Sequence, residues 1–150
     1  MSRESAKLGD RAEEEFVAFW KSRGKAAWHW KIEDTKALFG LNDRLVKNGG
    51  KPSDFIVCVE GLCALVEVKA TENERGFATS GIQRSQRMHA TMIAGARGPY
   101  YFAVRAFHPN VNAWFVVPAA EMLARKGRVG WDELAPWKRN TPCIPTPSPP

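Results

Sequence analysis

Hydrophobic and polar residues alternate along the chain with two different periods. Between residues 11 and 23 apolar side chains recur every three to four positions, which predicts an amphipathic helix that ends at Gly24. Residues 51–71 instead form two short apolar runs around Glu60-Gly61, which predicts a pair of strands. The remaining predicted elements are a strand at 26–32, a helix at 80–96, strands at 99–107 and 112–118, and a short helix at 119–127.

This order of elements predicts an α/β (α+β) fold, in which a mixed β-sheet is flanked by helices. The 150 residues are 44% hydrophobic and 25% charged, which fits one globular domain over residues 1–140. Residues 34–51 form a basic, irregular segment. The proline-rich residues 141–150 are expected to be a disordered tail.

Several classes of protein do not fit the sequence. No run approaches the ~18 apolar residues of a membrane span, and the charged N-terminus has no apolar region typical of a secretory signal. The three cysteines (Cys58, Cys63 and Cys143) are odd in number and lack metal-ligand spacing. We therefore expect a cytoplasmic protein without membrane contact and without a disulfide framework.

Three charged residues interrupt the apolar pair of strands. If Glu60-Gly61 is the centre of an even-numbered turn, Val59 faces Leu62, and counting back sets Asp54 opposite Glu67. Lys69 then shares their face, because side chains alternate along a strand. An odd-numbered turn would move Glu67 to the other face, and Glu-Gly does not by itself decide between the two.

Two carboxylates about 5 Å apart repel each other unless a cation lies between them. Mg²⁺ takes oxygen ligands and keeps several waters, which suits Asp54 and Glu67, and Mn²⁺ could replace it. A lysine beside such a metal can position water or stabilise negative charge on a phosphate. The alternative is a buried ion pair between Lys69 and one carboxylate, without chemistry.

The spacing P-S-D, twelve residues, E-V-K (Pro52 to Lys69) resembles the PD-(D/E)XK nuclease superfamily. The run 54–86 is similar to the RecU-type Holliday junction resolvases in particular. The shared features are the turn glycine Gly61, the E-x-K-x-T motif at 67–71, Asn73, Phe77, Gln86, and the G-x-x-x-E motif at 9–13. The resemblance covers residues 9–105, and Pro52-Ser53-Asp54 departs from the T-x-D of the family.

The resemblance implies a restriction-endonuclease-like fold and a site in which Glu13 joins Asp54 and Glu67 as a metal ligand. Lys69 and Gln86 complete the implied catalytic set. Helical periodicity independently places Glu13 within the apolar arc of its helix and turns Gln86 inward. Glu13 could instead pair with a surface lysine, and Gln86 could satisfy buried backbone groups, as is expected of His89.

The net charge of +6 is compatible with a nucleic-acid partner. The segment 34–51 lies where RecU-type proteins carry a stalk thought to enter the junction, although it could be a solvated loop. The candidate DNA-binding residues are Lys36, Arg44, Lys47 and Lys51, with Arg84 and Arg87 on the outer side of the second helix. The six tryptophans are assigned no role.

The resemblance implies a Mg²⁺-dependent endonuclease that cuts four-way DNA junctions. Two symmetric cuts would favour a homodimer. The alternatives are a nuclease of the same superfamily that acts on nicked, flapped or duplex DNA, or a catalytically silent DNA-binding module.

Overall fold

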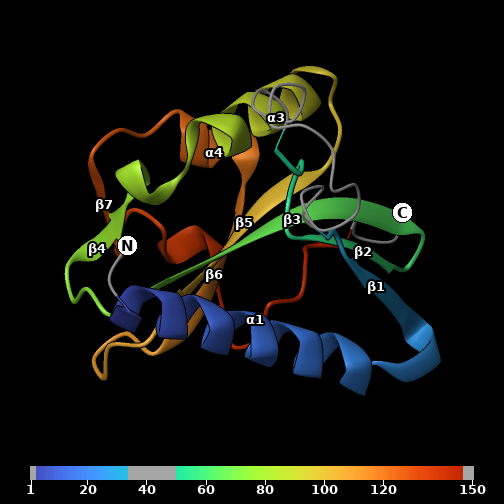
Figure 1. Cartoon of the computed structure of the whole chain (residues 1–150), viewed down its shortest axis with the longest axis horizontal. Coiled ribbons are helices and arrows are strands. Elements are labelled where there is room, and N and C mark those ends of the chain that lie inside the picture. The colour runs from blue at the N-terminus through green and yellow to red at the C-terminus, as the bar shows by residue number, and fades with distance from the viewer. Residues whose placement is uncertain (1–2, 34–49, 147–150) are drawn as a thin grey trace.

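The computed structural model describes residues 3–33 and 50–146 of the chain (Figure 1). The first helix, α1 (Arg3–Ser22), begins earlier than the periodicity predicts but buries the expected side. Ala12, Phe16 and Trp20 follow each other at a spacing of four and are fully buried. Gly24, with a φ of +56°, ends this helix. A short 3₁₀ helix, η1 (Gly24–Ala26), leads directly into β1 (Ala27–Lys31).

Six strands form one mixed sheet in the order β1-β2-β3-β5-β6-β8. The central strand β3 pairs antiparallel with β2 and parallel with β5, and the other pairs are antiparallel. The predicted mixed sheet is thereby confirmed. The further strands are β2 (Phe55–Val59), β3 (Leu62–Thr71), β5 (Tyr100–Ala106), β6 (Ala113–Pro118) and β8 (Lys138–Arg139).

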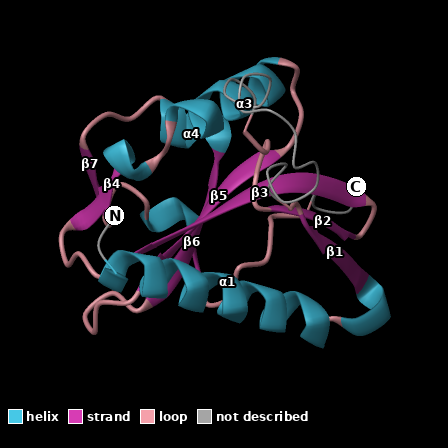
Figure 2. Cartoon of the chain, viewed as in Figure 1, coloured by secondary structure: helices cyan, strands magenta, loops and turns pink. Residues whose placement is uncertain are grey.

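Helices cover both faces of this sheet (Figure 2). α1 packs on one face, against β3 and β1, whereas α3 (Arg84–Gly95) and α4 (Ala119–Leu123) lie on the other, against β5 and β6. The helix predicted from residue 80 begins at Arg84, because residues 79–81 form the separate 3₁₀ helix η2 (Thr79–Gly81). The helix predicted at 119–127 ends at Leu123.

A second, two-stranded sheet was not predicted from the sequence. It joins β4 (Gly76–Ala78) to β7 (Arg128–Gly130) across a sequence separation that local patterns do not reveal. Each strand has only three residues, too few for an alternation to stand out. The 3₁₀ helix η3 (Ala135–Trp137) follows β7 and leads into β8.

Two hydrophobic cores lie on the two faces of the main sheet. The α1 side contains Phe16, Trp20, Phe55, Val57 and Val66 among others. The core on the α3 and α4 side is built around side chains from β5, β6 and both helices, including Phe102, Val104, Phe115, Ala90 and Met122.

Two expectations differ from the structure. Within the tail expected to be disordered, Pro142 is buried and Ile144 packs into the α1-side core with 2% exposure. Burial of this isoleucine holds residues 141–146 against the domain. The prediction of unpaired cysteines is wrong, because Cys58 and Cys63 form a disulfide and only Cys143 of the described cysteines is free. None of the helices in residues 3–33 and 50–146 is both long and apolar enough to cross a membrane.

Candidate functional site

The β2–β3 hairpin has the register that the sequence predicts. Glu60 and Gly61 both have positive φ angles, of 51° and 79°, as a two-residue type I′ turn requires. Val59 therefore faces Leu62, and Phe55 faces Val66. One step further, Asp54 and Glu67 lie on the same face, opposite to the face that joins the α1-side core.

Backbone and side-chain contacts fix Asp54 on both sides of its carboxylate. Oδ2 accepts a hydrogen bond of 2.9 Å from the Val68 backbone N–H, and Oδ1 lies 2.8 Å from Lys51 Nζ. The residue is 6% exposed. Two further hydrogen bonds hold the preceding segment: the Tyr100 hydroxyl donates to the Pro52 carbonyl (2.8 Å), and the Ser53 hydroxyl to the Phe55 carbonyl (3.0 Å). Ser53 therefore supports the backbone that presents Asp54.

Glu67 is almost completely buried, with 1% exposure. Its Oε1 lies 2.9 Å from Lys69 Nζ and accepts a hydrogen bond from Gln86 Nε2. Its Oε2 is buried and has no hydrogen-bond partner among the described residues. Burial first, and then repulsion from the Asp54 carboxylate, raise the pKa of Glu67 from 4.5 to about 7. Burial first, and then the charges of the same two carboxylates, also raise the pKa of Tyr100.

Gln86 is held in one orientation by the start of α3. Its Oε1 accepts a hydrogen bond of 2.9 Å from the Gln83 backbone N–H, while the Gln83 side chain accepts one from the Gln86 backbone. This reciprocal capping box leaves Nε2 directed at Glu67. The predicted inward orientation of Gln86 is confirmed, and its amide serves both the helix cap and the acidic pair.

The two carboxylates fit a Mg²⁺ ion. Glu67 Oε2, a buried carboxylate oxygen that no group in residues 3–33 and 50–146 pairs with, is costly unless a cation or a proton satisfies it. Within residues 3–33 and 50–146, no group of three or more acidic, histidine or cysteine side chains is placed to hold a metal. Mg²⁺ does not require one, because one or two carboxylates, waters and substrate phosphates commonly complete its shell.

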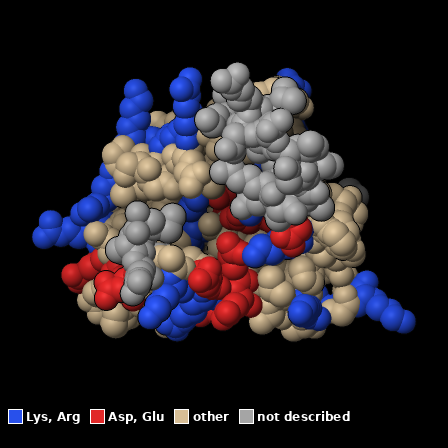
Figure 3. All heavy atoms as spheres, in the orientation of Figure 1, with Lys and Arg blue, Asp and Glu red and all other residues tan. Residues whose placement is uncertain are grey.

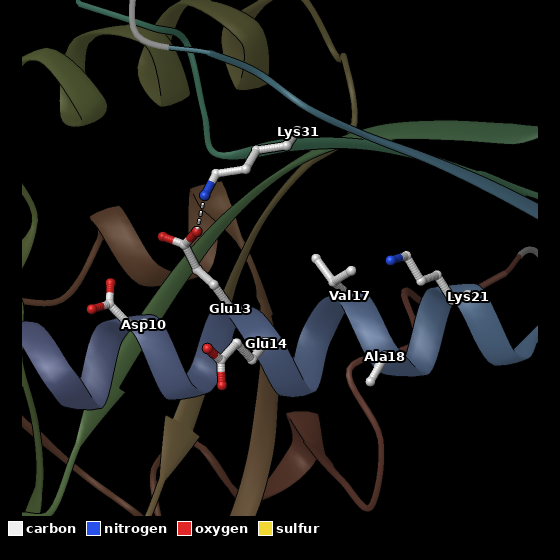
Figure 4. A pocket seen from close by; sticks show the side chains of 7 residues that line it. All are labelled: Asp10, Glu13, Glu14, Val17, Ala18, Lys21 and Lys31. Carbon is white, nitrogen blue, oxygen red and sulfur yellow. Dashed lines mark ion pairs between the residues drawn. The ribbon is translucent and has the colours of Figure 1, made fainter.

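The structure does not bring Glu13 to this pair. Glu13 lies on α1 and forms an ion pair with Lys31, with 2.7 Å between Oε2 and Nζ, as its alternative interpretation anticipated. Both residues line an open cavity of about 500 Å³ along α1 (Figure 4). Acidic atoms gather over the middle of this side of the molecule (Figure 3). The role of Glu13 as a metal ligand therefore stays a prediction.

The candidate DNA-binding residues have different surroundings. Lys51 is paired with Asp54, and Arg84 is exposed on α3. Arg87, which was expected to point outward, turns back and donates to the backbone carbonyls of Thr79 and Ile82. Lys36, Arg44 and Lys47 lie outside the described residues.

Sequence reasoning anticipated one feature near the site only in part and missed two others. His89 Nε2 lies 3.0 Å from the Gly50 carbonyl, which confirms the expected backbone contact but also anchors the segment before Lys51. The disulfide could have been predicted, because the register that places Asp54 opposite Glu67 also places Cys58 opposite Cys63. No sequence pattern indicated that Trp28 and Trp30 on β1 would be exposed, because their exposure depends on the position of that strand in the sheet.

Comparison with known proteins identifies the fold. No family model matches the sequence, and no curated protein matches it either. Among solved structures, the chain is similar to Hjc of Archaeoglobus fulgidus, a Holliday junction resolvase from an archaeal hyperthermophile. The TM-score is 0.54 at 14% sequence identity, over 88% of this chain and 90% of that one.

The chain has the fold of a Holliday junction resolvase. The match confirms the predicted restriction-endonuclease-like fold. At this low identity it concerns the arrangement of the elements, so the chemistry must be argued from the side chains themselves.

Proposed function

We propose that the protein is a metal-dependent, structure-specific DNA endonuclease, a Holliday junction resolvase that hydrolyses phosphodiesters in four-way junctions. The observation that carries the proposal is the set Asp54, Glu67 and Lys69 on one face of the resolvase fold. A buried carboxylate oxygen with no hydrogen-bond partner in the described part of the chain, beside a second carboxylate and an ammonium group, is costly in a purely structural role.

Asp54 and Glu67 would hold Mg²⁺, or Mn²⁺ in its place, and the bound ion would supply Lewis acidity toward a phosphate oxygen. The residues of the chain do the positioning. Val68 N–H and Lys51 fix the two oxygens of Asp54, and Gln86 fixes Glu67 Oε1. Lys69 carries its charge on the face where a phosphate would approach, and stabilises the negative charge that develops during hydrolysis.

Two copies of the chain would act together on a four-way junction. Resolution requires two symmetric cuts, and a C₂ homodimer supplies two equivalent sites. A DNA substrate favours the cytoplasm, where reducing thiols would act on the Cys58–Cys63 bond.

Cleavage of synthetic four-way junction, flap, nicked and linear duplex DNA, side by side in Mg²⁺, tests the proposal. The wild-type protein should cut the junction in preference, whereas Asp54→Asn and Glu67→Gln should lose cleavage by about 100-fold or more and still bind it. Glu60→Gln is the matched control, because it changes an exposed carboxylate in the turn of the same hairpin.

Each other outcome selects an alternative. Equal or preferred cutting of flap, nicked or linear DNA would make the protein a nuclease of the same fold with another substrate. DNA binding without cutting in Mg²⁺ or Mn²⁺ would make it a silent DNA-binding module. Cleavage by Asp54→Asn at the wild-type rate would mean that the carboxylate pair is not the active site.

A further inference from the structure

The edge strand β1 exposes two large aromatic rings. Trp28 is 50% exposed and Trp30 is 59% exposed, whereas the other large aromatic residues of the described chain are more covered. The two rings lie near each other, with centroids 6.4 Å apart and an angle of 14° between their planes. Exposed tryptophans two residues apart on a strand indicate a surface that meets a partner.

The rings share the sheet face of the carboxylate pair. Trp30 is directly opposite Ile56 and Trp28 opposite Cys58, and directly opposed residues lie on one face. Asp54 precedes Ile56 by two positions and therefore belongs to the same face. The pairing of the two strands continues beyond β1, since the Ile32 N–H donates to the Asp54 carbonyl over 2.8 Å.

A DNA strand bound at the carboxylate pair could reach the two tryptophan rings. One strand spacing of about 4.8 Å and two residues of about 3.3 Å each place the Cα of Trp30 about 8 Å from that of Asp54. This is about two to three base-stacking steps of about 3.4 Å. A DNA strand with a phosphate at Asp54 and Glu67 can therefore bring a base of the same or a neighbouring nucleotide to Trp30.

The exposed area fits bases better than a second protein. A tryptophan ring offers at most about 250 Å², so two half-exposed rings offer about 250 Å² together, against about 800 Å² per partner in a stable interface. Stacking of a base on an aromatic ring needs only such a small surface and contributes about 1–3 kcal/mol. Bases inside a continuous duplex have both faces stacked, whereas bases at a branch point do not.

We propose that Trp28 and Trp30 form a stacking platform for bases at the branch point of the DNA whose phosphate lies at Asp54 and Glu67. The platform deepens the proposed nuclease function and rests on it. It makes Trp30, the nearer ring, a specificity-determining residue that favours branched DNA over continuous duplex.

Binding of a four-way junction and of linear duplex, measured in Ca²⁺ to suppress cutting, tests the platform. Trp30→Ala should weaken junction binding by about 10-fold and leave duplex binding unchanged, because one stacking contact is lost. Trp30→Phe should keep most of the affinity, and Trp30→Leu should not, since leucine is apolar but cannot stack. Met92→Ala, at an α3 side chain that is 65% exposed, is the control and should bind like wild type.

Removal of the base gives the sharper test. Junctions with abasic sites at the branch point should bind wild type about 10-fold more weakly and should lose little further affinity with Trp30→Ala. If the losses of affinity caused by the abasic sites and by Trp30→Ala were independent and additive, the platform would be overturned. Equal binding by Trp30→Leu and wild type, or a parallel loss on duplex, would also overturn it.

Two controls separate this proposal from others. If wild type cuts the junction while every tryptophan variant binds and cuts like it, the platform is wrong and the nuclease function stands. If wild type neither binds nor cuts any of the DNAs, the proposed function itself fails. The last measurement is the sedimentation of the double variant Trp28→Ala/Trp30→Ala. If its mass were half that of wild type, this surface would join two copies of the chain, and base stacking would be overturned.

Discussion

At the scale of single residues, the most unusual group is the Glu67 carboxyl. Its pKa is raised from 4.5 to about 7, so the folded protein binds a proton that the unfolded chain releases near pH 4.5. The stability that this proton contributes is complete below pH 4.5 and is lost as the pH rises through about 7. We therefore expect the metal-free protein to lose about 5 °C in Tm between pH 5 and 8.

Calorimetric scans in a chelator, with and without added Mg²⁺, measure this effect. Mg²⁺ should raise the Tm more at pH 8 than at pH 5, because it competes with the proton for the same oxygens. Glu67→Gln should have a Tm that depends less on pH and does not respond to Mg²⁺. A Tm that rises between pH 5 and 8 in wild type but not in Glu67→Gln would contradict the raised pKa.

Lys69 gives a second prediction at this scale. Its ammonium lies 2.9 Å from Glu67 Oε1 and is only partly exposed, so it acts on the acidic pair and on what binds there. Lys69→Ala should reduce cleavage by about 100-fold while Mg²⁺ binding, measured by the rise in Tm, persists. Lys138→Ala, an exposed lysine on β8, is the control. Loss of Mg²⁺ binding in Lys69→Ala would assign the lysine a structural role.

The acidic pair could be predicted from sequence because it depends on local rules. The two-residue turn and the alternation along β2 and β3 are enough to oppose Asp54 and Glu67. The same counting opposes Cys58 and Cys63, but the odd number of cysteines obscured it. Contacts made from distant elements, such as that of the Tyr100 hydroxyl with Pro52, leave no local pattern and could not be foreseen.

At the scale of elements, the start of α3 is joined to the candidate site. Gln83 and Gln86 cap this helix reciprocally, but only Gln86 also contacts Glu67. Gln83→Ala should cost about 1 kcal/mol in the free energy of unfolding and leave cleavage nearly unchanged. Gln86→Ala should cost at least as much and also reduce cleavage.

Urea unfolding and junction cleavage of the two variants separate the two roles. Gln86→Glu can still accept the hydrogen bond from Gln83 but places a third carboxylate beside Glu67, so it should keep the cap and lose activity. Equal cleavage by Gln83→Ala and Gln86→Ala would show that the glutamine serves the helix alone.

Element boundaries were harder to predict than the elements themselves. The pattern identified the helix after the hairpin but not its start, because Ile82 is buried just before the cap and extends the apolar periodicity. The tail was expected to be disordered because its composition is typical of disorder, but in residues 141–146 both Pro142 and Ile144 are buried, and Ile144 packs into the core.

At the scale of the whole molecule, the role of the basic segment 34–51 distinguishes a junction resolvase from a general nuclease. If Lys36, Arg44 and Lys47 neutralise phosphates at the centre of a junction, the triple alanine variant should lose those contacts. The slope of log affinity against log salt should then fall by about one unit for each lost contact, on junction DNA. Binding to linear duplex should change much less, because duplex has no open centre.

Salt titrations of both DNAs in Ca²⁺, wild type against the triple variant, measure the difference. A parallel loss on junction and duplex would reduce the segment to a general basic patch, and no loss on either would leave it a solvated loop. The order of strands in the sheet could not be read from the sequence at all. The parallel pairing of β3 with β5 depends on a crossover through α3, which local periodicity does not reveal.

The two edges of the main sheet differ in a way that limits how copies of the protein can associate. Within the described residues, β8 ends one edge with only Lys138 and Arg139, whereas β1 offers five residues and two exposed tryptophans at the other. Charged, short edges resist further strand addition. Edge-to-edge growth is therefore open at one end only, so it closes at a pair and cannot continue into a fibre. Light scattering at rising concentration should therefore reach a plateau and should not climb steadily, as it would for an open-ended assembly.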